Sequence, residues 1–161
     1  MSINIQEIFE NCKEDPSLLS TLNIDEILDV IEKDKHEYLD NKTLETISQE
    51  IFEVINNLGI TKQNVKNMCE KLLEYRFVDE LFELHRGKYI RWIRKAKPEI
   101  LTNGGIVVDV KFLDNGTYVV VKNPSIPRFM QYKFDDCISF HKLSQEEQLI
   151  LMAYEIINKE E

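Results

Sequence analysis

Residues 106–122 read IVVDVKFLDNGTYVVVK, and this segment gives the strongest indication of the secondary structure. Apolar side chains recur at every second position from Ile106, which is typical of a half-buried β-strand. Asp114-Asn115-Gly116 then gives a strong tight-turn signal, because asparagine and glycine tolerate positive φ angles. Residues 117–122 supply the returning strand, so the stretch predicts a β-hairpin. One face of its first strand is expected to carry Ile106, Val108, Val110 and Phe112.

Three further short strands are predicted around this hairpin. They cover residues 88–94, 129–134 and 137–141, and the first of them places Ile90 and Trp92 on one face, as expected of core residues. Pro124 and Pro127 lie in the loop between two strands, where they need not donate to a ladder. Five antiparallel strands in so short a segment favour a small SH3-like barrel, because closure hides the strand edges.

The residues on either side of the predicted barrel show helical periodicity. Apolar stripes at a spacing of three to four residues occur within 24–39, 44–58 and 65–84, and Thr61 can cap the last of these segments. Near the C-terminus, Ser144 and Glu147 form a capping-box pattern ahead of another apolar stripe. We therefore predict an α+β protein: an acidic helical bundle over residues 1–84, then a basic β-barrel-like domain with a C-terminal helix over 85–161.

The charge distribution is uneven along the 161 residues. The formal net charge is -9, but residues 86–142 contain 11 Lys or Arg against 5 Asp or Glu, whereas residues 1–85 contain 8 against 19. A charge acts over about 8–10 Å at cellular salt, so the basic middle segment has its own local field. There is no long apolar run and no signal-peptide pattern, and the cysteine number is odd. These features predict a cytoplasmic protein with no membrane partner.

No arrangement of residues predicts an enzyme, a metal site or a cofactor. Cys12, Cys69 and Cys137 are far apart and lack metal-ligand spacing. Cys137 and His141 lie on one predicted strand about 13 Å apart, too far for a hydrogen bond. Phosphate-loop patterns are also missing from the sequence. We therefore name no catalytic residue, and expect a non-enzymatic interaction module.

A basic and aromatic cluster over residues 85–97 is the candidate binding site. Lysine and arginine neutralise phosphates, and tyrosine can stack on bases. The candidate contacts are Arg86, Lys88, Tyr89, Arg91, Arg94, Lys95 and Lys97. Three interpretations stay open: docking against the chain's own acidic half, binding of nucleic acid, and binding of an acidic protein partner. The alternative function is a structural or assembly protein whose helical domain mediates oligomerisation or partner binding.

A resemblance follows from three segments of the C-terminal half. LHRGKYIRWI, LTNGGIVVDVKF and FMQYKFDDCISFHKLSQEEQLILMAYE lie within residues 84–155. Together they resemble small uncharacterised proteins of nucleocytoplasmic large DNA viruses, the giant viruses. The resemblance implies a setting in the host cytoplasm or the virion, and a role in assembly, transcription or host interaction. It implies no catalytic residue.

Overall fold

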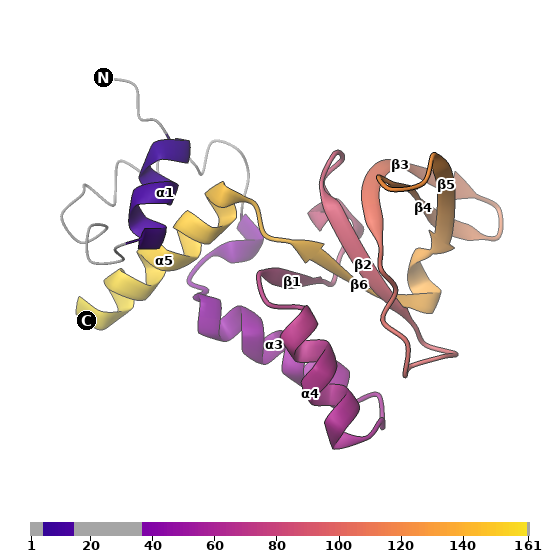
Figure 1. Ribbon diagram of the computed structural model, residues 1–161, viewed down its shortest axis with the longest axis horizontal. Coiled ribbons are helices and arrows are strands. Elements are labelled where there is room, and N and C mark those ends of the chain that lie inside the picture. The colour runs from indigo at the N-terminus through magenta and orange to yellow at the C-terminus, as the bar shows by residue number, and fades with distance from the viewer. Residues whose placement is uncertain (1–4, 15–36, 161) are drawn as a thin grey trace. The chain divides into compact units, whose positions relative to one another are not determined.

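The computed structural model describes residues 5–14 and 37–160, whose helices and strands are drawn as a ribbon in Figure 1. The chain divides into two compact units. The first combines Met1–Thr46 with Leu143–Glu161, and the second is Ile47–Lys142. No helix among the described residues is both long and apolar enough to cross a membrane.

The first unit packs two helices together. They are α1 (Ile5–Glu14) and α5 (Gln145–Glu160), with the short 3₁₀ helix η2 (Glu37–Leu39) beside α5. Leu39, Leu149 and Leu151 are completely buried. Most of the apolar stripe expected over residues 24–39 lies outside the described residues, and its last member, Leu39, is in η2.

The capping box expected at the start of α5 is confirmed. Glu147 donates its backbone N–H to Ser144 Oγ at 3.1 Å, and Ser144 donates its N–H to Glu147 Oε1 at 3.0 Å. The carboxylate is fully buried, and its second oxygen accepts a hydrogen bond from the Tyr38 hydroxyl at 2.9 Å. Hydrogen bonds to both oxygens offset the cost of burying this group.

The second unit begins with two helices. The first of them, α3 (Leu44–Asn56), starts at the boundary between the units, and α4 (Lys62–Lys71) follows a short turn. Thr61 caps α4 as expected, because its hydroxyl accepts the N–H of Asn64 at 3.2 Å. Each helix buries one apolar stripe, with Ile47, Ile51 and Ile55 on α3 and Val65 and Met68 on α4.

An open antiparallel sheet of six strands makes up the rest of this unit. Its order is β1-β6-β2-β3-β4-β5, so β1 and β5 are the edges. The strands are β1 (Tyr75–Val78), β2 (Tyr89–Arg94), β3 (Gly105–Leu113), β4 (Gly116–Asn123), β5 (Arg128–Lys133) and β6 (Cys137–Lys142). Figure 1 shows β1 lying beside β6.

The expected five-stranded barrel and the wholly helical first half are therefore wrong. Tyr75–Val78 was expected within a helical run, with a break near Tyr75–Phe77, but it forms the sixth strand. Glu74, just before it, has a φ of 67°, a left-handed conformation that ends the helical path. The new strand pairs with β6 along its full length, from Tyr75 opposite Lys142 to Val78 opposite Ser139. This pairing leaves the sheet with two free edges, instead of a closed ring of strands.

The sheet nevertheless curls around its own apolar core. Trp92 on β2 stacks on Tyr132 of β5, with ring centroids 4.3 Å apart, although β3 and β4 separate these strands in the sheet. Ile90, Val119 and Val121 complete the buried centre, each with no exposed surface. Ile90 and Trp92 were expected in the core, and their burial confirms this.

A bulge changes the expected faces of β3. The pairing of β3 with β4 shifts between Val107 and Asp109, so one extra residue interrupts the alternation. Val107 lies in the core before the bulge, and Ile106 lies on the opposite face. The expected grouping of Ile106 with Val110 and Phe112 is therefore wrong, because a strict period of two holds only in an uninterrupted strand.

Candidate anion-binding pocket on the sheet

One side of the sheet collects tyrosine and cationic side chains, and we call it the outer face. It is defined by Tyr89 and by the residues that share its side in the ladder. Tyr89 pairs with Ile106 on β3, and Tyr75 pairs with Lys142 on β1 and β6. The alternation along β2 places Arg91 on the same side as Tyr89. This outer face is the opposite side from the core that contains Trp92 and Tyr132.

A cavity of about 610 Å³ opens at this place, and we call it the sheet pocket. Its size falls within the range of about 300–1,000 Å³ that is usual for ligand sites. It is lined by strand residues and by two loops, one before β3 and one after β4. The lining residues are Tyr75, Tyr89, Arg91, Asn103, Asn123, Pro124, Ser125 and Lys142.

Two glycines bring one of these loops against the sheet. A side-chain carbon on Gly104 would lie 1.9 Å from the backbone oxygen of Ile90, and one on Gly105 would lie 2.6 Å from that of Lys122. Gly104 also has a φ of 76°. Only glycine fits so close to two neighbouring strands. The close approach lets the Asn103 backbone oxygen accept a hydrogen bond from the Tyr89 hydroxyl at 2.6 Å.

Arg91 is held in place by the same loop. Its Nε donates a hydrogen bond to the backbone oxygen of Thr102 at 2.8 Å. Thr102 is itself tied to Trp92, because its N–H donates to the Trp92 oxygen at 3.0 Å. The guanidinium of Arg91 is therefore oriented by backbone groups, and its charge is not neutralised by this contact.

Tyr75 reports the environment of the pocket. Burial raises the pKa of its hydroxyl above the ordinary value of 10.0, and the nearby Arg91 charge acts in the opposite direction. The hydroxyl is consequently a neutral hydrogen-bonding group at physiological pH. Tyr75 and Arg91 thus lie close enough to interact, although they come from β1 and β2, which β6 separates.

The pocket is a cationic cavity. Arg91 and Lys142 contribute two positive charges, and none of the eight lining residues is Asp or Glu. Asn123, Ser125 and the Tyr75 hydroxyl add polar groups that can donate hydrogen bonds, whereas the Tyr89 hydroxyl already donates to Asn103. Ser125 already uses its backbone N–H on Asn123 Oδ1, at 2.9 Å, which shapes the turn. This combination suits an anionic group such as a phosphate.

The seven candidate contacts do not form one surface. Of these, Tyr89 and Arg91 line the sheet pocket. Arg94 and Lys97 line a separate small recess beside Ile100. The remaining three are placed elsewhere.

Those three cations lie apart from the pocket. Arg86 forms an ion pair with Asp109 at 3.0 Å, and both side chains are largely exposed. Lys95 donates to the backbone oxygen of Asp135 at 2.9 Å, and Lys88 is exposed. Alternation along β2 and the turns at its two ends separate these residues, which the sequence groups together.

Sequence analysis missed most of the residues that line the pocket. Tyr75 was expected in a helix, and Asn103, Asn123, Ser125 and Lys142 are distant from the basic cluster in sequence. The sequence signals for the two loops were the Gly104-Gly105 pair, which indicates a turn, and the prolines Pro124 and Pro127. The convergence of four strands and two loops depends on pairings between residues up to 67 positions apart, as with Tyr75 and Lys142.

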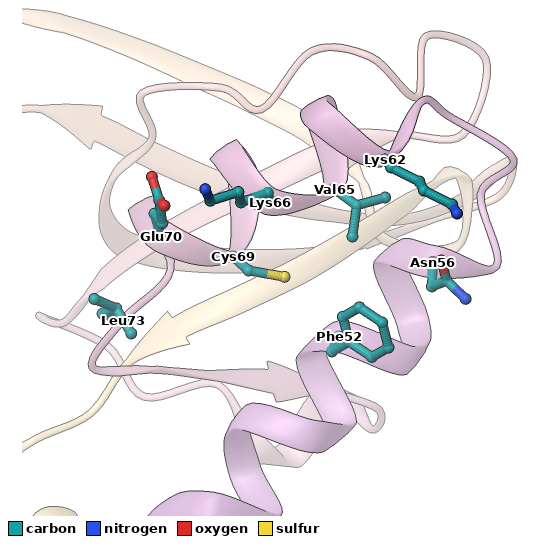
Figure 2. A pocket seen from close by; sticks show the side chains of 8 residues that line it. All are labelled: Phe52, Asn56, Lys62, Val65, Lys66, Cys69, Glu70 and Leu73. Atoms are coloured by element: carbon teal, nitrogen blue, oxygen red, sulfur yellow. The ribbon is translucent and has the colours of Figure 1, made fainter.

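A second hollow lies between α3 and α4, and it is apolar. Its volume is about 500 Å³. Figure 2 shows the ring of Phe52 on α3 and the thiol of Cys69 on α4 turned toward the space between the helices. Phe52 and Leu73 are exposed, whereas Val65 is buried. We call this hollow the helix groove; its remaining lining residues are Asn56, Lys62, Lys66 and Glu70.

The cysteines and the acidic residues show no metal site in the described parts of the chain. Cys12, Cys69 and Cys137 are all free thiols. Over residues 5–14 and 37–160, no three His, Cys, Asp or Glu side chains are grouped so that they could hold a metal ion.

Comparison with known proteins identifies no relative. No family model, no curated protein and no solved structure matches the chain.

Proposed function

We propose that this chain is a binding protein that takes up a phosphate group of a nucleic acid in the sheet pocket. Arg91 and Lys142 contact the phosphate oxygens, and the tyrosine rings lie beside the neighbouring sugar or base. Arginine suits this role because its planar fork can donate two parallel hydrogen bonds to one phosphate.

One observation supports the proposal above all others. The pocket gathers two cations from different strands and includes no carboxylate among its eight lining residues. Like charges at one site repel each other and lower stability unless an anion joins them. The chain has a net charge of -9 and therefore an excess of carboxylates, yet none of them lines the pocket.

A nucleic acid explains more of the pocket than an acidic protein does. A carboxylate-rich peptide needs cations, but it makes no use of Tyr75 and Tyr89. Aromatic rings next to cations are the usual arrangement where proteins hold a phosphate backbone and its bases together.

Fluorescence anisotropy with a labelled single-stranded oligonucleotide tests the proposal. We expect binding at low salt and an affinity that falls as the salt concentration rises, because phosphate contacts release bound counterions. In a plot of log affinity against log salt concentration, each phosphate contact contributes about 0.7 to the slope. Arg91→Gln and Lys142→Gln each reduce the affinity by about tenfold or more, because each removes a charge-assisted hydrogen bond. Lys142 is exposed, so its replacement leaves the fold intact.

Arg94→Gln is the matched control. Arg94 lies three residues beyond Arg91 on the same strand, but it is exposed and outside the sheet pocket. Its replacement removes the same charge as Arg91→Gln. Because Arg94 does not line the sheet pocket, we expect an affinity close to that of the unmodified protein. Equal losses for Arg91→Gln and Arg94→Gln contradict the proposal. So does unchanged binding by the Lys142→Gln protein, or an absence of binding at low salt.

A competitor distinguishes the other class of partner. Poly-L-glutamate carries the charge but neither bases nor phosphates. If it displaces the oligonucleotide as well as an unlabelled copy does, the pocket recognises an acidic chain and the nucleic-acid proposal is wrong.

Self-association is a second candidate function, and the helix groove favours it. Phe52 and Leu73 are large, exposed apolar residues at its two sides. Its rim carries both signs, with Lys62 and Lys66 near one end and Glu70 further along α4, so two copies related by a two-fold axis can pair lysine with glutamate.

Light scattering after size-exclusion chromatography tests this candidate. We expect a concentration-dependent dimer that Leu73→Lys converts to a monomer. Phe82→Lys is the control, because Phe82 is 72% exposed but is not part of the groove. A monomer at all concentrations, or equal effects of both substitutions, contradicts self-association through the groove.

A further inference from the structure

The outer face continues from the sheet pocket across β3, β4 and β5. The ladder runs from Tyr89 to Ile106, from Ile106 to Lys122, and from Lys122 to Phe129. Directly paired residues lie on the same side of a sheet, about 5 Å apart. One row of side chains therefore leads from the pocket to the edge strand β5.

Aromatic side chains on this part of the sheet are unusually exposed. Phe129 has 65% of its surface exposed, although it lies in a strand with a buried residue, Tyr132, on the opposite side. Tyr118, on β4 and on the same face, is half-buried, and its hydroxyl accepts a hydrogen bond from Asn115 Nδ2 at 2.9 Å. Exposure alone does not distinguish Phe129 from Phe82 or Phe112, which are also exposed; what distinguishes it is its place in the row that leads from the sheet pocket.

Lysines stand next to both aromatic residues. Lys122 pairs directly with Phe129, and Tyr118 lies between Lys111 and Lys133 in the ladder. Each ring thus has a cation within one strand spacing. Lys111 and Lys122 are exposed, so their ammonium groups are available to solvent or to a ligand.

The one carboxylate that the strands β3–β5 place on this face is already engaged. Asp109 pairs with Val120 in the ladder and forms the ion pair with Arg86 at 3.0 Å. Its charge is consequently offset by a cation outside the row. The field along the face is positive, which attracts a polyanion and repels another cationic surface.

We infer that the β3–β5 part of the outer face, which we call the stacking track, holds the bases of a single-stranded nucleic acid. This inference rests on the proposed function of the sheet pocket. The strand places a phosphate between Arg91 and Lys142, then crosses β3 and β4. Its bases stack on Phe129 and Tyr118 while the lysines meet its phosphates.

Single strands fit this surface better than duplexes do. In a duplex, the faces of the bases are covered by their neighbours, so an aromatic ring on a sheet cannot reach them. In a single strand, each base presents a face that can stack, whatever its identity. The track also lacks a protruding helix or ribbon that could enter a groove.

A single substitution separates the track from the pocket. Phe129→Ser removes the most exposed ring of the track. We expect it to lower the affinity for an oligothymidylate of about ten nucleotides by about fivefold or more, as the loss of one stacked base predicts. The salt dependence stays as steep as in the unmodified protein, because no phosphate contact is lost. A pocket substitution such as Lys142→Gln makes it shallower.

Phe112→Ser is the matched control. Phe112 is 74% exposed and lies on β3, but alternation places it on the opposite side from Lys111 and Tyr118. Its replacement removes an equally exposed ring, and we expect no change in affinity. Equal losses for Phe112→Ser and Phe129→Ser overturn the inference, because they indicate a nonspecific apolar effect.

An abasic strand provides a second readout. An oligonucleotide of the same length without bases keeps every phosphate, so the sheet pocket can still bind it. We expect the unmodified protein to bind it at least as weakly as the Phe129→Ser protein binds the complete oligonucleotide, because the abasic strand loses stacking on both Phe129 and Tyr118. Equal affinity for the abasic and the complete strand overturns the stacking track.

The outcomes distinguish the two proposals. If Phe129→Ser binds normally while Arg91→Gln and Lys142→Gln lose affinity, the stacking track is wrong and the pocket proposal stands. If the unmodified protein prefers a hairpin duplex to the single strand, the track is again wrong. If no nucleic acid binds at low salt, both proposals fail together.

Discussion

Tyr132 holds the curled sheet together, and its hydroxyl can be tested by substitution. The ring stacks on Trp92, and the hydroxyl lies 2.7 Å from Ser139 Oγ on β6. Tyr132 and Ser139 are 4% and 1% exposed, so water cannot replace either partner. Tyr132→Phe keeps the stacked ring and deletes only the hydroxyl.

The expected loss of stability is the cost of leaving one of the two buried hydroxyls without its hydrogen-bond partner. We expect Tyr132→Phe and Ser139→Ala each to lower the free energy of unfolding by about 1–2 kcal/mol. The double variant leaves neither hydroxyl unpaired. Its loss in free energy of unfolding should therefore be about 1 kcal/mol smaller than the sum of the two single losses. For a chain of this length, each kcal/mol lowers the melting temperature by about 2–4 °C.

Urea unfolding followed by tryptophan fluorescence is the assay. Trp92 is the single tryptophan, it is 2% exposed, and it contacts Tyr132 directly, so its emission reports the unfolding of the curled sheet. Tyr118→Phe is the control, because its hydroxyl bond to Asn115 lies at an exposed turn and is worth less than about 0.5 kcal/mol. If the effects of the two single variants add within about 0.3–0.5 kcal/mol, the two hydroxyls do not interact.

Three further predictions concern titration, thiol reactivity and backbone fit. Burial raises the pKa of Tyr132, so above about pH 10 the hydroxyl ionises in the unfolded chain before it does in the folded one, and the free energy of unfolding falls. Tyr132→Phe lacks this hydroxyl, and a decline of its urea midpoint as large as that of the unmodified protein contradicts this cause. Burial also raises the pKa of the Cys69 and Cys137 thiols, so both should react with iodoacetamide at pH 8 more slowly than free cysteine; equal rates count against it. In urea unfolding, Gly104→Ala should lower the free energy of unfolding by about 2–4 kcal/mol, because its side-chain carbon meets the Ile90 backbone. Gly59→Ala, whose side-chain carbon meets open space, should lower it by about 1 kcal/mol, and similar losses contradict the close approach at Gly104.

Local patterns predicted many of the strands and helix starts. The alternation over residues 106–122 and the Asp114-Asn115-Gly116 turn correspond to β3, β4 and the hairpin between them. Thr61 and Ser144 cap the helices that follow them. Helix caps and tight turns depend on interactions between residues that are close in sequence. They can therefore be recognised without knowledge of the fold.

Features that depend on distant pairing were predicted poorly. Tyr75–Val78 is too short to show a strand period by itself, and its strand conformation depends on pairing with β6. The bulge after Val107 is a response of β3 to its partner strand, and it reverses the faces that a regular strand would have. Closure of the sheet into a barrel was wrong because strand count alone does not say which edges meet.

The candidate site divides in the same way. The sequence alone determined that Tyr89 and Arg91 share one face of a strand within a basic segment, because side-chain direction alternates along any strand. It took the folded chain to show that Tyr75, Asn103 and Lys142 join them in one cavity and that Arg86 pairs with Asp109 instead. The reason is physical: a cavity is made where separate segments meet, and the packing that brings them together is a property of the whole core.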